Sequence, residues 1–493
     1  MSREVREKMA HGVMWMVLFK LTERSLGFIS TLILVRLLSP ADFGITAMAV
    51  SFIAMAETFT AFGFDVNLIQ NQNATEEHYH TAWTCNVLLG LSITVMMLAA
   101  APLVASFYKH PELFWVVCAL ALGPLISACE NIGVVAFRKD MRFKREFAFQ
   151  LSRKIIGFLV VVPLAYILRS YWALVIGILV SKLTGTTISY LLHPFRPRYS
   201  LTQMRGLLGF SKWMLLLNVL GFLKESMSNF VLGRLLGAAP LGVYNVSYEI
   251  TSMPTTELSA PINRALVPGF ARIAHDPEST RTTYGTAMGM LALVAVPAAT
   301  GIFAMAPYIV PVLLGQKWLA GVPVMEILAF SGALGLFHSS IGAALIATGH
   351  PDRVTKTTGV FVAMLMGLLA LLVPGHGLRG AAYAMLTTSI LTTPMFLYQA
   401  WRGIGVPATV FLAAAARPVL AALAMAALLR YCLPEWTPAM SQPIAIGWTV
   451  GGIALGIVAY ALGILLLWLA ARRPAGAERA LAEWLRQRLR RRR

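Results

Sequence analysis

The chain has 493 residues, of which 57% are hydrophobic and 13% are charged, and its mean hydropathy is +0.69. This composition is far more apolar than that of a soluble domain and indicates a protein of the lipid bilayer. The net charge of +19 would suggest nucleic-acid binding in a soluble protein, but here the basic residues lie between long apolar runs, so we read them as topology signals and expect no nucleic-acid partner. The four cysteines form no C-x-x-C pair and have no histidine cluster beside them, which disfavours a metal ribbon, an iron–sulfur site and a disulfide framework. We expect no cofactor.

Apolar runs predict the membrane helices. The first run follows the charged residues 1–8 and continues to Leu38 without a small-residue cleavage site, so we expect a retained helix and not a signal peptide. Stretches long enough to cross a hydrocarbon core of roughly 30 Å predict about fourteen helices, and the fold class is all-α and polytopic. The expected spans are 12–37, 42–69, 81–107, 113–137, 147–168, 170–192, 208–236, 240–267, 283–313, 321–347, 355–374, 377–400, 405–430 and 443–470.

The connecting loops alternate between rich and poor in Lys and Arg. One side carries the basic loop 138–145, further arginines between later pairs of spans and the Arg-rich tail, whereas the other side carries little beyond Lys109, Lys317 and Arg379. Because cytoplasmic loops are enriched in Lys and Arg, we expect both termini in the cytoplasm. The loop 71–80 is an exception, since it lacks basic residues but lies on the inner side by count.

An internal repeat indicates two lobes. Residues 36–45 match residues 234–243 at an offset of 198, and Trp15-Met16 matches Trp213-Met214 at the same offset. About six helices separate the copies, and an even number preserves orientation, so the repeats are parallel and related by an axis along the membrane normal. We expect two six-helix lobes around a central cavity, followed by a helix pair. The expected boundaries are 1–205 for the N-terminal lobe, 206–403 for the C-terminal lobe, 404–471 for the helix pair and 472–493 for a basic cytoplasmic tail.

Ionisable residues within the spans mark a pathway, because a charge at membrane depth is costly unless it faces water, a partner or a ligand. They concentrate on the first two helices of each lobe. The candidate substrate-binding cations are Lys20, Arg24, Lys224 and Arg264, and the candidate ion-coupling or cavity acids are Glu57, Asp65, Glu225, Glu249 and Glu257. Further candidates are Glu130, Lys182 and Glu326, and Arg153 and Lys154 either meet an anionic head group or anchor the inner end of their helix. The alternative for the whole set is structural pairing, with Lys20 or Arg24 neutralising Glu23.

The predicted eighth helix and its end contain three regularly spaced prolines. Pro254, Pro261 and Pro268 recur every seven residues, and Gly63 lies opposite Pro261 by the repeat offset, so these positions are candidates for a gating hinge or for a static kink. The segment 477–493 places Leu481, Trp484, Leu485 and Leu489 on one side and arginines elsewhere. This pattern favours a short helix on the inner leaflet, with a disordered basic tail as the alternative.

Four motifs carry a resemblance to a known family. They are Arg36-Leu37-Leu38 followed by Asp42-Phe43-Gly44, Phe62-Gly63-Phe64 running into Leu68-Ile69-Gln70, Asn263-Arg264-Ala265-Leu266 with Pro268, and Pro311 to Trp318. With these motifs the chain resembles the Wzx-type flippases of the MOP transporter superfamily, particularly the colanic-acid exporter type. The resemblance implies translocation of undecaprenyl-pyrophosphate-linked oligosaccharide repeat units across the bacterial inner membrane by alternating access, for exopolysaccharide or O-antigen assembly. It also implies membrane lipids as partners, together with the polysaccharide polymerase and export machinery.

The resemblance implies a role for the ionisable residues within the spans, because a pyrophosphate that leaves water needs cationic partners. Lys20 and Arg24 are the first choices for these partners, and Lys224 is the next. Two other classes remain as alternatives. A MATE-like drug/cation antiporter would share the twelve-helix core and is favoured by an acidic, apolar cavity. A membrane enzyme such as a polymerase or ligase would need a substantial external loop, and the outward loops are short and carry no catalytic motif. We therefore expect a transporter and not an enzyme.

Overall fold

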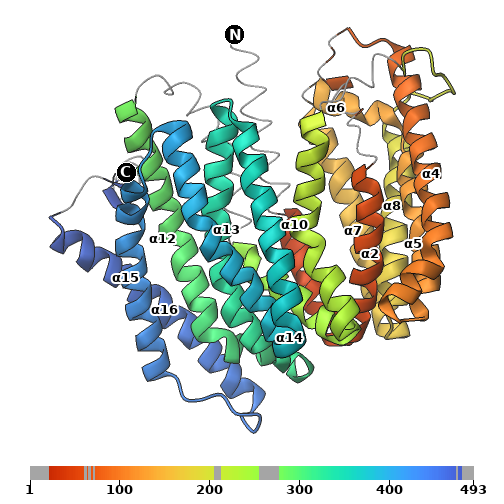
Figure 1. Cartoon of the computed structure of the whole chain (residues 1–493). Helices are drawn as coiled ribbons and strands as arrows, with labels where there is room; N and C mark the ends of the chain where they lie inside the picture. The colour runs from red at the N-terminus through yellow and green to blue at the C-terminus, as the bar shows by residue number, and fades with distance from the viewer. Residues whose placement is uncertain are drawn as a thin grey trace, which may run out of the picture. The chain divides into compact units, whose positions relative to one another are not determined.

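The computed structural model describes residues 22–59, 64, 68–69, 71, 73–140, 142–204, 212–254, 277–472, 476–479 and 483. Within these ranges the chain forms helices and no β-strand (Figure 1). Contacts divide the chain into two units, Met1–Gly242 and Val243–Arg493. The all-α fold class is confirmed, while the lobe boundaries at 205, 403 and 471 stay a prediction.

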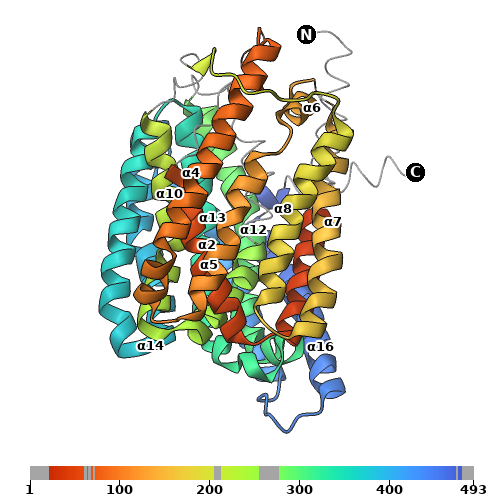
Figure 2. The same ribbon diagram turned by 90° about the vertical axis from the view of Figure 1, so that its right-hand side faces the viewer.

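The first unit begins with a helix at 22–37. It continues through α2 (Pro40–Phe59), α4 (Glu76–Tyr108), α5 (Glu112–Ala128), η1 (Ile132–Val134), α6 (Val135–Lys139), α7 (Phe143–Leu168), α8 (Trp172–Leu192) and α10 (Lys212–Leu236). Helix α5 packs along α4 and α8, α7 packs along α8, and α2 packs against α5 and α10 (Figure 2). Helix α2 therefore connects α10 with the rest of this unit.

The second unit begins within a helix that starts at residue 238 and is described to residue 254. It continues through α12 (Pro277–Ile309), the π-helical turn η2 (Val310–Leu314), η3 (Gln316–Gly321), α13 (Val322–Ala347), α14 (Pro351–Ile404), α15 (Ala408–Cys432) and α16 (Gln442–Ala470). Helix α14 is two helices, because Gly377 at φ 55° and ψ −132° breaks it. Only glycine adopts such a backbone conformation without strain.

The described helices account for each predicted span. Nine of them are long and apolar enough to cross a membrane, and a tenth span arises if α5 is joined to η1 and α6 across a bend of 61°. When α14 is divided at Gly377 and the helices at 22–37, 212–236 and 238–254 are added, every one of the fourteen predicted spans has its helix. The prediction of about fourteen helices is confirmed.

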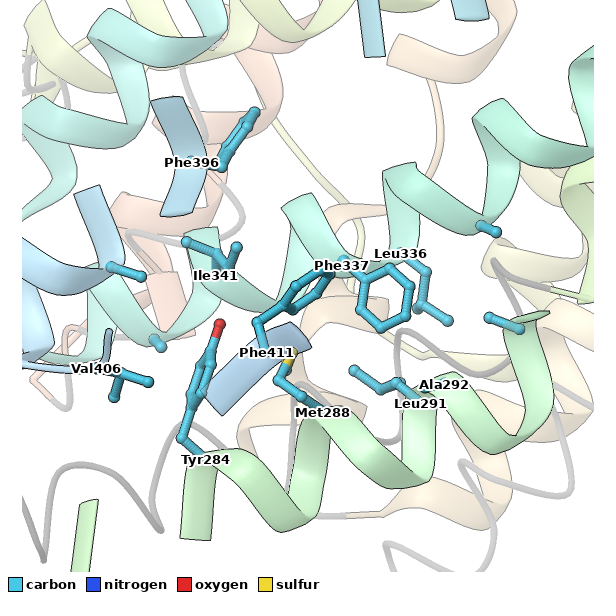
Figure 3. Packing of buried hydrophobic residues seen from close by; sticks show 14 of the residues in the cluster. Tyr284, Met288, Leu291, Ala292, Leu336, Phe337, Ile341, Phe396, Val406 and Phe411 are labelled. Carbon is cyan, nitrogen blue, oxygen red and sulfur yellow. The ribbon is translucent and has the colours of Figure 1, made fainter. Parts of the chain in front are cut away.

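Small and aromatic residues build the core of the second unit (Figure 3). Alanines of α12 and α13 let these helices approach closely, which is how membrane helices gain packing contacts in the absence of a hydrophobic drive. Phe337 of α13 packs edge-to-face on Phe411 of α15, with 5.0 Å between ring centroids. His338 stacks on Phe396 of α14 at 4.2 Å and shares a hydrogen bond of 2.9 Å with Thr393 Oγ1.

The sequence Ser39-Pro40-Ala41-Asp42 starts α2 as a capping box with proline at the first helical position. The backbone N–H and the hydroxyl of Ser39 both donate to Asp42 Oδ2, at 2.9 and 2.6 Å. The other carboxylate oxygen of Asp42 accepts the backbone N–H of Tyr171 at 2.8 Å. Asp42, the aspartate of the first family motif, therefore caps α2 and links it by a hydrogen bond to the turn between α7 and α8.

The repeat appears in the structure as a reciprocal contact. A Cβ at Gly44 would overlap the carbonyl oxygen of Ala238, and a Cβ at Gly242 would overlap the carbonyl oxygen of Pro40. The offset of 198 residues converts the first contact into the second, because it relates Gly44 to Gly242 and Pro40 to Ala238. A contact in which the two copies exchange roles is the signature of a two-fold relation. This geometry supports the parallel repeat and explains both glycines.

The turns poor in Lys and Arg meet at one end of the first unit. Asp42 contacts Tyr171, as described above, and Tyr108 at the end of α4 lies against Gly233 of α10. The guanidinium of Arg234 lies 5.7 Å from the centroid of the Phe107 ring. The turns after the helix at 22–37 and after α10 therefore lie at the same end, as parallel repeats require.

The loops rich in Lys and Arg meet at the other end of the first unit. The loop 71–80, which lacks basic residues, lies among them: Lys139 Nζ donates to the carbonyl oxygen of Asn71 at 2.8 Å, and the Arg198 backbone N–H donates to His80 Nδ1 at 3.0 Å. Neighbouring loops thus supply the positive charge that this loop lacks. The grouping of loops agrees with the predicted topology.

His193 lies in this basic end. Its Nδ1 accepts the backbone N–H of Phe195 at 3.2 Å, and its ring packs against Phe137. Burial, followed by the positive charges of Arg142 and Arg145, lowers the pKa of His193 below its ordinary value. The neutral ring is the form that this packing requires.

Candidate functional site

Three ion pairs join different helices of the first unit at positions within the predicted spans. Arg153 pairs with Glu130, Lys154 pairs with Glu23, and Lys182 pairs with Glu57. Two of the cations are neighbours on α7, and the third is on α8. The sequence identified these side chains as candidates, but it named none of the three pairings, because each joins residues at least 23 positions apart.

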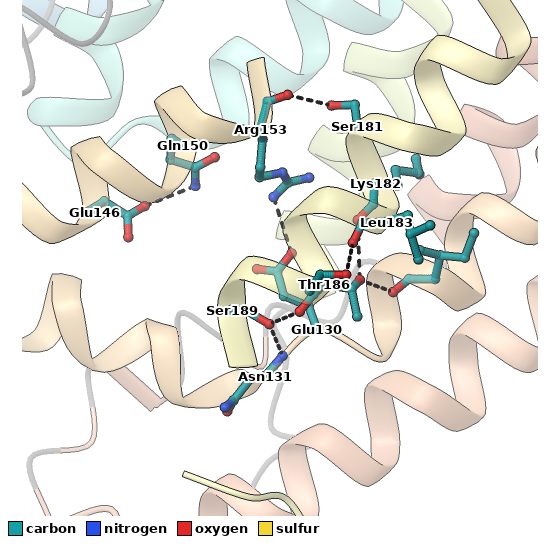
Figure 4. A network of polar contacts seen from close by, with 12 residues as sticks. Glu130, Asn131, Glu146, Gln150, Arg153, Ser181, Lys182, Leu183, Thr186 and Ser189 are labelled. Atoms are coloured by element: carbon teal, nitrogen blue, oxygen red, sulfur yellow. Dashed lines mark hydrogen bonds and ion pairs between the residues drawn. The ribbon is translucent and has the colours of Figure 1, made fainter. Parts of the chain in front are cut away.

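The pair between Arg153 and Glu130 lies at the break after α5 (Figure 4). The Arg153 Nη1 and Glu130 Oε2 atoms are 3.3 Å apart, and the side chains are 25% and 21% exposed. A Cβ at Gly185 of α8 would lie 2.6 Å from Arg153 Nε, so the absence of a side chain there makes room for the guanidinium. This close fit indicates that Arg153 holds the packing of α7 and α8.

Polar side chains of α8 satisfy the backbone groups that the break leaves free. Thr186 donates to the carbonyl oxygen of Ile126 at 2.6 Å, and Tyr190 donates to that of Cys129 at 3.1 Å. The backbone N–H of Asn131 donates to Ser189 Oγ at 2.9 Å. A broken helix at membrane depth is tolerated only where neighbours make such bonds.

The pair between Lys182 and Glu57 joins α8 to α2. The Nζ and Oε1 atoms are 3.2 Å apart, and the side chains are 24% and 42% exposed. Gly123 of α5 makes room for the lysine stem, since a Cβ there would lie 3.0 Å from Lys182 Cδ. Glu57, a candidate ion-coupling acid, therefore has a lysine partner in the structure.

The pair between Lys154 and Glu23 is the most open of the three. The Nζ and Oε1 atoms are 3.5 Å apart, and the lysine side chain is 51% exposed while the glutamate is 21% exposed. The next residue after Glu23 is Arg24, which is exposed. Glu23, for which the sequence suggested Lys20 or Arg24 as a partner, therefore has Lys154 as a partner in the structure.

Helix α10, the counterpart of the first helix in the repeat, carries Lys224 and Glu225. Lys224 is half-buried and Glu225 is exposed. Asn229, four residues after Glu225, donates to Ser51 Oγ of α2 at 2.9 Å. This hydrogen bond holds α10 to α2.

In the second unit, Glu249 is exposed and Pro254 is half-buried near the described end of its helix. The remaining predicted site residues lie outside the described ranges. They are Lys20, Arg264, Asp65, Glu257, Gly63, Pro261 and Pro268.

An apolar pocket of about 460 Å³ opens between α12, α15 and α16. Its walls include Leu293 and Ile302 of α12, Met425 and Leu429 of α15, and Ile457 of α16. Nothing in the sequence pattern distinguished these residues from other lipid-facing side chains.

The sequence also missed the contact that the C-terminal segment makes. Glu478 accepts from Arg417 of α15 through both carboxylate oxygens, at 2.7 and 2.9 Å. Ala477 is buried, and a Cβ at Gly289 of α12 would lie 2.9 Å from its methyl group. The start of the tail thus packs on protein, whereas the sequence placed it on the leaflet surface.

Among the described residues, no group of three or more His, Cys, Asp or Glu side chains is arranged to hold a metal ion. The four cysteines are free thiols. The site chemistry of the described residues is therefore that of paired cations and carboxylates.

Comparison with known proteins identifies the family. The profile of a family described as "Polysaccharide biosynthesis protein" matches residues 33–323. The chain belongs to this family. The family match and the relatives described next confirm the resemblance to Wzx-type flippases.

Two relatives match most of the chain. The lipopolysaccharide biosynthesis protein WzxC of Escherichia coli (strain K12) is 25% identical over 399 residues, which cover 79% of this chain and 80% of that protein. The succinoglycan biosynthesis transport protein ExoT of Rhizobium meliloti (strain 1021) is 23% identical over 457 residues, which cover 92% of each chain. Their names agree with the prediction of a transporter and not an enzyme.

Solved structures show the same fold. The lipid II flippase MurJ in an inward closed conformation superposes with a TM-score of 0.76 at 11% identity, covering 94% of this chain and 100% of that chain. A multidrug resistance MATE family transporter of the MOP superfamily, in an inward-facing conformation, superposes with a TM-score of 0.58 at 16% identity, covering 84% and 96%. These likenesses confirm the predicted all-α polytopic fold.

Proposed function

We propose that this chain is a flippase that moves undecaprenyl-pyrophosphate-linked oligosaccharide repeat units from the cytoplasmic to the periplasmic leaflet of the bacterial inner membrane. The family match, the relatives named for polysaccharide biosynthesis and transport, and the MurJ-like fold support this function. The translocated units serve exopolysaccharide or O-antigen assembly. The polysaccharide polymerase and export machinery are the proposed downstream partners.

The exposed pair between Lys154 and Glu23 is the basis for proposing where the substrate's diphosphate binds. Lys154 is half exposed, whereas Arg153 and Lys182 are about one quarter exposed and fit against glycines. A diphosphate offers the same charge-assisted hydrogen bonds as a carboxylate and carries more negative charge, so it can replace Glu23 as the partner of Lys154. Arg24 follows Glu23 in the same helix and supplies further positive charge, and Lys20 precedes Glu23 by three residues in the sequence.

The apolar pocket between α12, α15 and α16 suits part of the polyprenyl chain. Its walls are aliphatic side chains, methionines, glycines and Tyr460, and its volume is about 460 Å³. A lipid-linked substrate needs apolar surface for its tail and cationic partners for its diphosphate. The chain supplies both kinds of surface.

The predicted topology supports the proposed direction of transport. The alternating Lys and Arg count supports cytoplasmic termini, and it places the basic loops of the first unit on the inner side. Alternating access then exposes the cations first to the cytoplasmic leaflet and later to the periplasmic leaflet.

The test is complementation of a deletion strain. The strain should accumulate a defined lipid-linked oligosaccharide and export no polymer, and the wild-type gene should reverse both effects. Lys154→Gln and Arg24→Gln should each restore export poorly at normal protein abundance, because loss of a charged hydrogen bond costs about 1.5–3 kcal/mol, or about ten- to a hundredfold in affinity. Lys356→Gln is the matched control, since Lys356 forms an exposed pair with Asp352.

Glu23→Gln separates substrate binding from structural pairing. If Lys154 binds the diphosphate, Glu23→Gln should retain export. Equal loss of export and abundance in Glu23→Gln and Lys154→Gln would contradict the binding role. Export of lipophilic cations without any effect on the lipid-linked oligosaccharide would instead favour the drug antiporter.

A further inference from the structure

A charged pocket lies in the second unit. It has a volume of about 370 Å³ and is formed by α12, α13 and the second half of α14. Its polar residues include Glu326 of α13, together with Arg379 and Tyr383 of α14, and its apolar walls include Phe303 and Phe330. The sequence singled out Glu326, and the proposed transport pathway assigns it no role.

A second arginine stands beside this pocket. The guanidinium of Arg430 of α15 lies 4.5 Å from the centroid of the Phe303 ring, and Phe303 packs against Phe330 at 5.4 Å. Arg430 therefore lies beside a ring that forms part of the pocket wall, and Arg379 lines the pocket together with Glu326. Among the described residues, however, none of these three charged side chains forms an ion pair within 4.0 Å.

The pocket lies where four helices approach the same end of the unit. Glu326 is in the second turn of α13, Arg379 follows the break at Gly377, and Arg430 is two residues before the end of α15. The predicted topology makes this the outer end. Positive residues are not expected on this side for topological reasons, so the arginines need another explanation.

The exposed side chains of α14 and α15 next to the pocket are aliphatic, as on a surface that faces hydrocarbon. On α14 the exposed side chains beyond Tyr383 include Ile390 and Leu391, and on α15 those before Arg430 include Leu423 and Leu428. A water-filled lumen would not be lined by such aliphatic stripes. The occupant of the pocket therefore comes from the bilayer, with its polar part at the depth of the lipid head groups.

We propose that this pocket binds the head group of an ethanolamine phospholipid. Such a head group carries a phosphate and a primary ammonium a few bonds apart. The phosphate meets Arg379 and Arg430, whose planar guanidinium groups suit phosphate oxygens. The ammonium meets the carboxylate of Glu326, and the rings of Phe303, Phe330 and Tyr383 supply further favourable contacts for a cation.

Glu326 distinguishes this ligand from other lipids. A glycerol phospholipid has the phosphate but no ammonium, so it would leave the carboxylate of Glu326 unpaired beside its own negative charge. The pocket should therefore prefer ethanolamine to glycerol head groups, and Glu326 should set that preference.

The experiment uses native mass spectrometry of the purified full-length protein with phosphatidylethanolamine or phosphatidylglycerol of identical acyl chains. The wild type should bind phosphatidylethanolamine about tenfold more tightly. Glu326→Gln should abolish this preference while it retains phosphatidylglycerol, and Arg379→Gln should weaken both lipids about tenfold. Arg402→Gln, at the other end of α14 where Arg402 lies over the Tyr398 ring, is the matched control and should change neither.

Two further arms identify the source of the ligand. Soluble phosphoethanolamine should compete only weakly, because it lacks acyl chains; if it competes as well as the lipid, the site is one for a free phosphate compound. A lipid preference that is absent in the wild type, or that survives in a correctly folded Glu326→Gln variant, would overturn the proposal. So would displacement of the lipid by the oligosaccharide portion of the substrate, which would make the pocket a glycan site.

Discussion

The buried pair between Arg417 and Glu478 should hold the start of the C-terminal segment against α12 and α15. Glu478→Gln keeps the shape of the side chain but removes its charge. The two hydrogen bonds of 2.7 and 2.9 Å are charge-assisted, and the Arg417 and Glu478 side chains are 23% and 6% exposed. The substitution leaves the guanidinium without its counter-charge in a site that water scarcely reaches.

The magnitude follows from this burial. Breaking a buried ion pair by removing one partner costs about 3–5 kcal/mol. Because Arg417 is nearly one quarter exposed, the lower end of that range applies, and about 3 kcal/mol corresponds to roughly a hundredfold rise in the undocked population. The pair between Arg479 and Glu483 is a useful contrast, since its side chains are 59% and 56% exposed and surface pairs contribute about 0–1 kcal/mol.

Trypsin cleavage after Arg479 measures the undocked population, because proteolysis follows the open fraction when reclosing is fast. Mass spectrometry of the released fragment should show cleavage about a hundredfold faster in Glu478→Gln than in the wild type. Glu483→Gln should change the rate less than fivefold, and the double variant Arg417→Glu/Glu478→Arg should recover part of the protection. Cleavage of Glu478→Gln at the wild-type rate would refute the assignment of this pair as the anchor.

Two other predictions follow from the first unit. Gly44→Ala and Gly242→Ala should each destabilise the protein by about 1–3 kcal/mol, because the added Cβ overlaps a backbone carbonyl and the helices must separate. Thermal unfolding in detergent measures this loss, and Gly27→Ala, where a Cβ meets nothing within 4 Å, should cause none. His193 has a folded-state pKa below its unfolded value of about 6.5, so the unfolded form binds more protons and stability falls as the pH drops below that value. Hydrogen exchange of the Phe195 amide, corrected for intrinsic rates, should therefore be less protected at pH 5.5 than at pH 7.5, and a His193→Gln variant that kept the same pH dependence would contradict this cause.

Most of the fold was predictable because it depends on the order of residues along the chain. Apolar length predicts each span, and Lys and Arg counts predict which loops share an end. The turn at Ser39 to Asp42 has the sequence of a capping box, and the structure forms one. The reciprocal contact of Gly44 and Gly242 was implied by the repeat, although nothing in a single sequence showed how closely the backbones approach.

The pairing of charges was not predictable for a physical reason. A span of four residues places two side chains on one helix face, so sequence spacing identifies neighbours such as Lys20 and Arg24. One partner of Glu23 among the described residues is Lys154, more than a hundred residues away, and which helices become neighbours depends on packing. The break after α5 was missed for the same reason, because α8 supplies the bonds that make it tolerable.

The motif residues Asp42 and Gly44 and the proposed substrate cation Lys154 lie on different helices. Asp42 caps a helix and holds a turn, and Gly44 permits a backbone contact; both roles depend on one geometry that no other side chain reproduces. A diphosphate, in contrast, accepts charged hydrogen bonds from lysine as well as from arginine, so the proposed site does not depend on one side chain in one geometry. A resemblance in the scaffold therefore identifies the kind of transporter, while the choice of glycan depends on contacts that the motifs do not specify.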